Sequence, residues 1–177
     1  MDTAYLGLGS NRGDRRARLQ AAVDGLHGRA TIRVQAVSAL YETEAHTLDP
    51  DEEQRPFLNA VVEIHVEDTP EALLATAHAI EADEGRTRTG RRWAPRPLDI
   101  DLLAVGAKTC ATDTLTLPHP RLAERRFVLR PWADLASEFV VPAPFDASVQ
   151  TLLDRCPDTA EVRRVDQSLP GLHPSGE

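Results

Sequence analysis

Two carboxylates at alternating positions of an apolar segment are the residues of this chain best suited to chemistry. Asp99 and Asp101 alternate with Leu98, Ile100 and Leu102. In a β-strand, residues two apart leave the same face, about 7 Å apart along the backbone, so both acids face one side and the apolar residues face the core. Neighbouring carboxylates on a rigid strand repel each other unless a cation lies between them. The pair therefore favours one or two hard, oxygen-preferring ions such as Mg²⁺.

A basic segment directly precedes the two acids. Residues 86–96 contain five cations and no acid, namely Arg86, Arg88, Arg91, Arg92 and Arg96. Guanidinium groups bind phosphate oxygens bidentately, and a carboxylate-bound metal neutralises the bridging oxygens of a polyphosphate. Taken separately, a D-x-D pair also fits the solvated face of a half-covered sheet, and an arginine-rich loop also fits ordinary surface. Their closeness in the sequence favours a polyphosphate site.

Composition limits the classes of partner. The 177 residues fit a single domain, and 41% hydrophobic with 27% charged residues is ordinary for a soluble globular protein. A net charge of −8 with one concentrated basic segment favours a small anionic ligand over a nucleic-acid track. Cys110 and Cys156 match no metal or redox spacing, so we expect reduced thiols. We see no leader or membrane span, and expect a cytoplasmic protein without membrane or nucleic-acid partners.

The order of the elements predicts the fold class. We expect strands at 4–8, 32–41, 57–66 and around the two aspartates, and helices before Gly28 and from Thr69 to Gly85. This is α+β: a ferredoxin-like βαββαβ antiparallel sheet with both helices on one face and an open active-site face, plus C-terminal additions. We assign residues 1–168 to one domain and 169–177 to a disordered tail. The acidic segment 42–56 is a candidate lid.

The strand at 57–66 supplies further candidates. Its side chains alternate, so that Phe57 and Asn59 share one face and Leu58, Ala60 and Val62 the other. Phe57 and Asn59 are therefore expected on the open face together with the two aspartates. Four more polar or aromatic candidates follow residue 106, in a proline-framed turn and in the segment after it: Thr116, His119, Arg125 and Phe127.

Several motifs give the chain a strong resemblance to a known family. They occur in family order and spacing from Ala4 to about Pro142, and the R-W-x-P-R-x-L-D-x-D run and the L-P-H-P element together are highly specific. The motifs are Gly9-Ser10-Asn11, Tyr41-x-Thr43, Phe57-Leu58-Asn59-Ala60, Gly85-Arg86-x-Arg88, Arg92-Trp93-x-Pro95-Arg96-x-Leu98-Asp99-Ile100-Asp101, Leu115-x-Leu117-Pro118-His119-Pro120 and Arg125-x-Phe127-Val128-Leu129. The sequence resembles the 6-hydroxymethyl-7,8-dihydropterin pyrophosphokinases.

This resemblance implies an activity and a set of site residues. The family passes the diphosphate of ATP to a pterin alcohol in folate biosynthesis. By resemblance, Asp99 and Asp101 hold two Mg²⁺ ions, and Arg86 and Arg96 stabilise charge during transfer. The residues expected around the pterin are Thr43, Phe57, Asn59, Trp93 and Phe127. Those expected around ATP are Glu81, Arg88, Arg96, Thr116, His119 and Arg125.

Two other functions fit the same element order. A nucleotidyltransferase also combines a Gly-Ser turn with a D-x-D strand, although its two motifs lie close in sequence, whereas Ser10 and Asp99 are far apart here. An RNA-binding module uses the same sheet but needs exposed aromatic residues on its central strands. Aromatic residues make up only 5% of this chain, and the fourth strand carries acids.

Overall fold

A six-stranded antiparallel sheet forms the centre of the fold. The computed structural model describes residues 1–45, 55–85 and 97–170. The first part of the chain contains β1 (Asp2–Ser10), α1 (Arg15–His27), β2 (Ile32–Val37), β3 (Tyr41–Thr43), β4 (Phe57–Val66), α2 (Pro70–Asp83) and β5 (Asp99–Val105). The strand order is β10-β3-β4-β1-β5, and β2 also pairs with β4. The predicted βαββαβ order is therefore confirmed.

The strand expected at 32–41 is divided into β2 and β3. Both pair with β4, but Ser38 interrupts the ladder between them, because its Oγ accepts the hydrogen bond of the Val61 N–H at 2.9 Å. The side chain thus takes the place of a backbone carbonyl, and the chain bends before Tyr41. As a result β3 lies beside the first residues of β4, next to Asn59.

The predicted ends of both helices are confirmed. Asp14 caps α1, since its Oδ1 accepts the Ala17 N–H at 3.0 Å. Thr69 caps α2 through the Ala72 N–H at 3.3 Å, and Pro70 occupies the first turn, where no N–H is needed. Gly85 follows α2 with φ +82°, a conformation that glycine adopts without steric cost.

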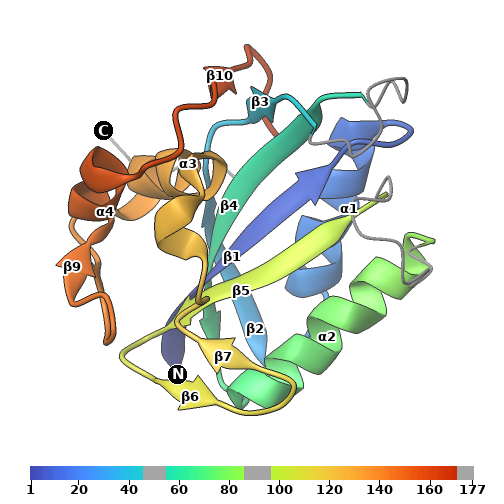
Figure 1. Cartoon of the computed structure of the whole chain (residues 1–177). Coiled ribbons are helices and arrows are strands. Elements are labelled where there is room, and N and C mark those ends of the chain that lie inside the picture. Colours follow the sequence, from blue (N-terminus) through green and yellow to red (C-terminus); the bar gives the residue numbers. More distant parts are fainter. Residues whose placement is uncertain (46–54, 86–96, 171–177) are drawn as a thin grey trace.

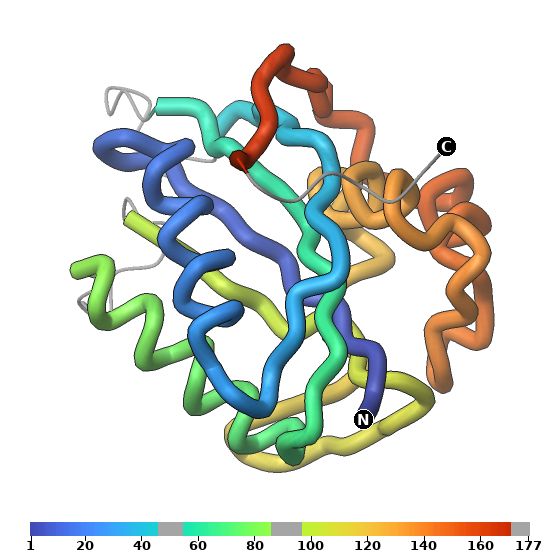
Figure 2. Tube along the Cα trace, turned by 180° about the vertical axis from the view of Figure 1, so that it is seen from behind, coloured from blue at the N-terminus to red at the C-terminus, as the bar shows by residue number. Residues whose placement is uncertain are grey.

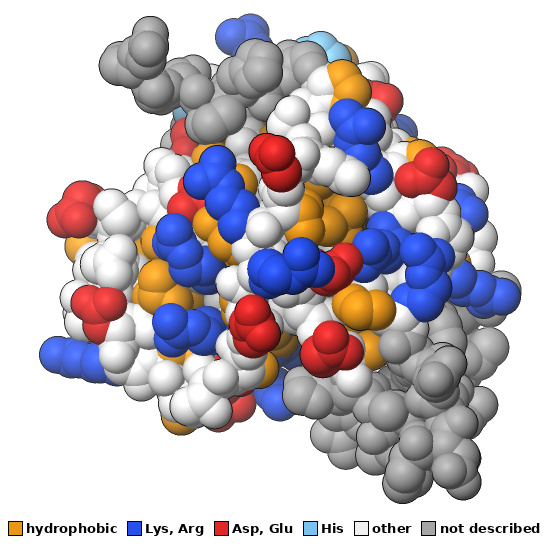
Figure 3. Space-filling view, turned by 90° about the horizontal axis from the view of Figure 1, so that it is seen from above, with side chains coloured by type: hydrophobic (Ala, Val, Ile, Leu, Met, Phe, Trp, Pro, Cys, Tyr) orange, Lys and Arg blue, Asp and Glu red, His pale blue; other side chains and the backbone are white. Residues whose placement is uncertain are grey.

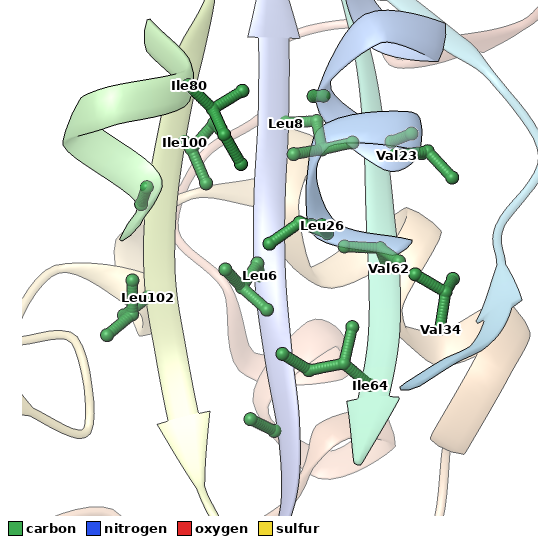
Figure 4. Close-up of a cluster of buried hydrophobic side chains, with 14 of the residues drawn as sticks. Leu6, Leu8, Val23, Leu26, Val34, Val62, Ile64, Ile80, Ile100 and Leu102 are labelled. Carbon is green, nitrogen blue, oxygen red and sulfur yellow. The ribbon is translucent and has the colours of Figure 1, made fainter. Parts of the chain in front are cut away.

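One core fills the space between the sheet and helices α1 and α2. Figure 4 shows side chains of β1, β4 and β5 pointing toward these helices, with Val23 and Leu26 of α1 and Ile80 of α2 packed against them. The strand residues in this core include Leu6, Leu8, Val62, Ile64, Ile100 and Leu102. The predicted alternation of β4 and β5 is thereby confirmed.

The second part of the chain covers much of the opposite face. It contains β6 (Cys110–Ala111), β7 (Thr116–Leu117), the 3₁₀ turn Leu122–Glu124, α3 (Arg126–Ala136), β8 (Val140–Val141), β9 (Ala147–Ser148), α4 (Val149–Arg155) and β10 (Arg163–Arg164). Figures 1 and 2 show α3 and α4 on the side of the sheet away from α1 and α2. Cys110 and Cys156 are free thiols, as expected.

The predicted open active-site face is covered in part. Tyr5, Val61 and Leu103 point to this side and pack with Leu129 and Trp132 of α3 in a second core. The apolar side chains of these strand residues explain why a helix covers them. The end of the sheet that carries Phe57, Asn59 and Asp99 lies outside this core. The covered central strands also lack the exposed aromatic platform of an RNA-binding module.

The expected tail begins too early. Leu169 is 3% exposed and packs in the first core, and the Ser168 carbonyl accepts two hydrogen bonds from Arg16. Residue 169 therefore belongs to the folded domain, since burial of its side chain holds the segment on α1. Residues 171–177 of the predicted tail lie outside the described part of the chain. None of the described helices is both long and apolar enough to cross a membrane.

The contact between α1 and α2 gives a stability prediction. A Cβ added at Gly25 would lie 3.1–3.3 Å from three atoms of the buried Ile80 side chain. We expect Gly25→Ala to lower the free energy of unfolding by about 1 kcal/mol, because overpacking outweighs the better helix propensity of alanine. Urea unfolding measures this change. In an Ile80→Val background the same substitution should cost clearly less; equal costs in both backgrounds would contradict the proposed clash.

Candidate active site

One row of residues crosses the open end of the sheet. In the register of the adjacent strands β4, β1 and β5, Gly9 of β1 lies between Asn59 of β4 and Asp99 of β5. Neighbouring strands are about 4.8 Å apart, so the backbones of Asn59 and Asp99 lie about 10 Å apart. Because Gly9 carries no side chain, the surface between the Asn59 amide and the Asp99 carboxylate is flat. This surface is called the floor below. Figure 3 shows this end of the molecule from above, where basic side chains gather around exposed hydrophobic atoms, with carboxylates among them.

Asn59 and Thr43 form the amide side of this floor. Asn59 is 5% exposed, and its Nδ2 donates to Thr43 Oγ1 at 2.9 Å and to the Tyr41 carbonyl at 3.4 Å. The pairing of β3 with β4 brings these residues together. Since Nδ2 is occupied by the protein, Oδ1 is the atom presented toward Gly9, 3.4 Å from the place of a Cβ there. The site therefore offers a fixed hydrogen-bond acceptor beside the Phe57 ring.

Asp99 and Asp101 form the acidic side, and a cation and a ring lie next to them. Arg125 Nη1 lies 3.2 Å from Asp101 Oδ2, with side-chain exposures of 23% and 33%. The same guanidinium lies 5.9 Å from the centre of the Phe127 ring. The structure thus brings Asp101, Arg125 and Phe127 together, although they come from β5 and from the start of α3.

The acidic pair fits magnesium. Within the described residues no group of three or more Asp, Glu, His or Cys side chains could hold a metal ion. Mg²⁺, however, is commonly held by one or two carboxylates, with waters and substrate phosphates supplying the other ligands. Two strand carboxylates next to the Arg125 guanidinium are such a donor set.

Glu81 has a position that the sequence did not predict. It is 2% exposed, and its Oε1 accepts the Ile100 N–H at 2.8 Å. β5 is an edge strand, so this N–H points away from β1 and toward α2. Glu81 therefore holds the backbone between Asp99 and Asp101. Its expected contact with ATP stays a prediction.

His119 is held as a neutral hydrogen-bond donor. Its Nδ1 accepts the Arg121 N–H at 3.1 Å, which leaves the ring proton on Nε2. The backbone N–H of His119 donates to the Leu103 carbonyl at 2.9 Å. Burial and then the charges of Arg125 and Arg121 lower the pKa of His119 to about 4, against partial opposition from Asp99. Thr116 lies exposed in the neighbouring β7.

The lowered pKa of His119 predicts how stability depends on pH. The folded protein keeps His119 neutral down to about pH 4, whereas the unfolded chain takes up the proton below pH 6.5. This group therefore destabilises the fold progressively between pH 6.5 and 4, by up to about 3 kcal/mol. His119→Asn, whose amide oxygen can accept the Arg121 N–H, should lose less stability over this range in urea unfolding. The exposed His27→Asn serves as the control, and parallel pH profiles for His119→Asn and the wild type would refute the prediction.

The remaining predicted site residues lie outside the described part of the chain. Arg86, Arg88, Trp93 and Arg96 belong to residues 86–96, whose placement is not described. One feature that the sequence did not predict is the ion pair of Arg15 of α1 with Glu42 of β3, 2.8 Å long. Opposite charges at these positions are visible in the sequence, but nothing local predicts that α1 and β3 meet.

The fold and the site together define an enzyme class. A ferredoxin-like sheet whose open end carries two acids, a guanidinium and a flat floor with an amide is suited to phosphoryl-type transfer onto a flat heterocycle. The family model described as 7,8-dihydro-6-hydroxymethylpterin-pyrophosphokinase (HPPK) matches residues 5–137. The chain belongs to this family.

Curated relatives agree with the family match. The chain is 47% identical over 141 residues to the 2-amino-4-hydroxy-6-hydroxymethyldihydropteridine pyrophosphokinase of Methylorubrum extorquens, covering 80% of this chain and 87% of the relative. It is 43% identical over 135 residues to the Bacillus subtilis enzyme of the same name, covering 76% and 78%. The chain is accordingly an ATP-dependent pyrophosphokinase of folate biosynthesis that acts on small molecules.

A solved structure supports the fold. The Plasmodium falciparum HPPK-DHPS crystal structure resembles this chain with a TM-score of 0.66 at 13% identity. The similarity covers 87% of this chain but 44% of that larger one, so this chain spans less than half of that protein. At this identity the likeness concerns the fold alone, and it confirms the predicted α+β class.

Proposed function

We propose that the open end of the sheet, defined by Asn59, Gly9 and Asp99, is where the chain transfers diphosphate from ATP to 6-hydroxymethyl-7,8-dihydropterin. The observation that supports this most is the row itself. The Asn59 amide and the Asp99 carboxylate lie on one floor with no side chain between them, which would suit a flat ring beside a metal–phosphate complex. A bound ring and a triphosphate would lie side by side on such a floor.

The pterin side of the proposal uses stacking and edge recognition. Phe57 and Phe127 contribute the two ring faces, and aromatic stacking favours a flat heterocycle. Asn59 Oδ1 accepts a hydrogen bond from an N–H on the pterin edge, while Thr43 fixes the amide in the required orientation. Trp93 is a further proposed pterin contact.

The nucleotide side uses charge. Two Mg²⁺ ions held by Asp99 and Asp101 would supply neutralisation of the phosphate oxygens. Arg125 binds phosphate from the position in which it now pairs with Asp101, and His119 donates a hydrogen bond from Nε2 without adding charge. Thr116, Glu81, Arg88 and Arg96 are the other proposed ATP contacts.

The proposed step is an in-line displacement. The pterin hydroxyl oxygen forms a bond to the β-phosphorus of ATP, the bond from that phosphorus to the bridging α–β oxygen breaks, and AMP leaves. The hydroxyl proton passes to solvent. Arg86 and Arg96 stabilise the charge that develops. Positioning and charge neutralisation carry such a reaction, so no strong general base is required.

The nucleotide product tests the proposal. With ATP, Mg²⁺ and hydroxymethyldihydropterin, we expect AMP and pterin diphosphate in equal amounts, measured by chromatography of both products. Reactions without pterin serve as the control and should leave ATP intact. Formation of ADP, or consumption of ATP at the same rate with and without the pterin, would rule out this transfer. The cytoplasmic location stays a prediction.

A further inference from the structure

The chain after α4 touches both sides of the proposed site. Residues 156–169, called the C-terminal brace below, lie beyond residue 137, where the match to the family model ends. We propose that the brace is a positioning element for the reaction: Asp158 fixes the start of α3, and Arg163 fixes β3. This inference rests on the proposed function, because Phe127 and Arg125 belong to the start of α3 and Thr43 belongs to β3.

The first contact completes the end of a helix. Arg125, the residue preceding α3, makes no side-chain cap. The N–H of Arg126, the first residue of α3, instead donates to Asp158 Oδ2 at 3.3 Å. Asp158 Oδ1 in turn accepts the Ala160 N–H at 2.9 Å, which orients the carboxylate. The Asp158 carboxylate therefore caps α3 from a distant segment and holds the amide of Arg126, which lies between Arg125 and Phe127. The negative charge of this carboxylate is favourable at the helix N-terminus.

The second contact holds the amide side of the floor. β10 pairs with β3, and Arg163 forms an ion pair with Glu42, next to Thr43. Glu42 also binds Arg15, whose other nitrogen donates to the Pro56 carbonyl at 2.7 Å, next to Phe57. Burial opposes ionisation of Glu42, but the guanidiniums of Arg15 and Arg163 outweigh it and lower the pKa of Glu42. The carboxylate is thus charged at neutral pH and links three segments.

The far end of the brace is anchored on the first core. Leu169 is buried there, Arg16 donates twice to the Ser168 carbonyl, and the Val165 N–H donates to the Leu40 carbonyl at 2.9 Å. The brace is therefore fixed at both ends and spans from α3 to β3 and α1. Figure 1 shows β10 lying beside β3 after the chain has passed α4.

The two elements that the brace contacts, β3 and α3, also contact each other directly. This contact shows what the brace adds. Tyr41 of β3 donates from its hydroxyl to Asp134 of α3 at 2.7 Å. Burial and this hydrogen bond raise the pKa of Tyr41 to about 12, so the donor stays protonated. This contact lies toward the C-terminal end of α3, about two turns from Arg126. The brace supplies the constraint at the end that carries the site residues.

The two halves of the brace predict different kinetic signatures. Asp158→Ala releases the start of α3, so we expect about a fivefold to tenfold rise in KM for both the pterin and ATP. Asp158→Asn should restore both values, because an asparagine side chain caps a helix as well as aspartate does. Arg163→Ala releases β3 alone and should raise KM for the pterin severalfold while KM for ATP stays unchanged. Asp154→Asn, at the exposed end of α4, is the control.

A second measurement separates this inference from the proposed function. Hydrogen exchange of the full-length protein should become about fivefold to tenfold faster at the first turn of α3 in Asp158→Ala and not in Asp158→Asn. If the wild type formed no AMP, the proposed function would fail, and exchange alone would decide whether the brace holds α3. Wild-type KM values or unchanged exchange in Asp158→Ala would overturn the brace. An equal rise of both KM values in Arg163→Ala would do so as well.

Discussion

Replacing Asp99 or Asp101 by asparagine is expected to lower turnover at least about a thousandfold while the chain stays folded. Loss of metal-mediated charge stabilisation removes several kcal/mol from the transition state, which corresponds to about three powers of ten in rate. Both side chains lie on the partly exposed face of β5, and their alternation partners Ile100 and Leu102 fill the core. The asparagine variants keep the shape and the strand, so a thermal melt should change little.

The two variants should differ in a second respect. Asp101 pairs with Arg125, so Asp101→Asn also frees a guanidinium that then binds the nucleotide without a competing carboxylate. We therefore expect ATP affinity to fall more in Asp99→Asn than in Asp101→Asn at saturating Mg²⁺, measured by calorimetry with a non-hydrolysable ATP analogue. Asp113→Asn, in the exposed turn before β7, is the matched control. Near-wild-type turnover of either site variant at limiting Mg²⁺ would disprove the metal assignment.

Much of the fold could be predicted because its signals are local. The alternation in β4 assigns Val62 and Ile64 to the core, and Thr69 with Pro70 marks the start of α2. Helix α3 could not be predicted in this way. Pro131 lies inside it, where the missing N–H and the ring normally disfavour a helix, yet burial of Leu129 and Trp132 against the sheet outweighs that cost. Tertiary packing decided this element.

The candidate site was predictable as a set of residues and not as an arrangement. Alternation assigns Asn59 and Asp99 to the same face, but only the register of β1 with both neighbours places Gly9 between them. Register depends on long-range pairing, which a single sequence does not reveal. Glu81 shows the same limit. Its hydrogen bond to the Ile100 N–H joins α2 to the edge strand β5, and the two residues are 19 positions apart in the sequence.

Filling the floor at Gly9 is expected to weaken pterin binding about a hundredfold. A Cβ at this position would lie 3.4 Å from Asn59 Oδ1 and 3.8 Å from Phe57 Cδ1. In Gly9→Val the two added methyl groups rise from the floor between Asn59 and Asp99, where the flat ring is proposed to lie. Overpacking of this kind costs about 1–3 kcal/mol, and the upper end corresponds to two powers of ten in Kd. Gly9→Ala should show a smaller loss.

The Gly9 variants also test whether the loss of affinity is specific to the pterin. Valine favours the extended backbone of a central strand, so Gly9→Val should melt close to the wild-type temperature. Fluorescence titration with the pterin and calorimetry with the ATP analogue then compare the two ligands, with Gly28→Ala at the end of α1 as the control. Pterin affinity should fall in the order glycine, alanine, valine, while ATP affinity changes by less than about threefold. Equal losses for both ligands would mean that the ring does not lie over Gly9, and wild-type pterin affinity in Gly9→Val would place it elsewhere altogether.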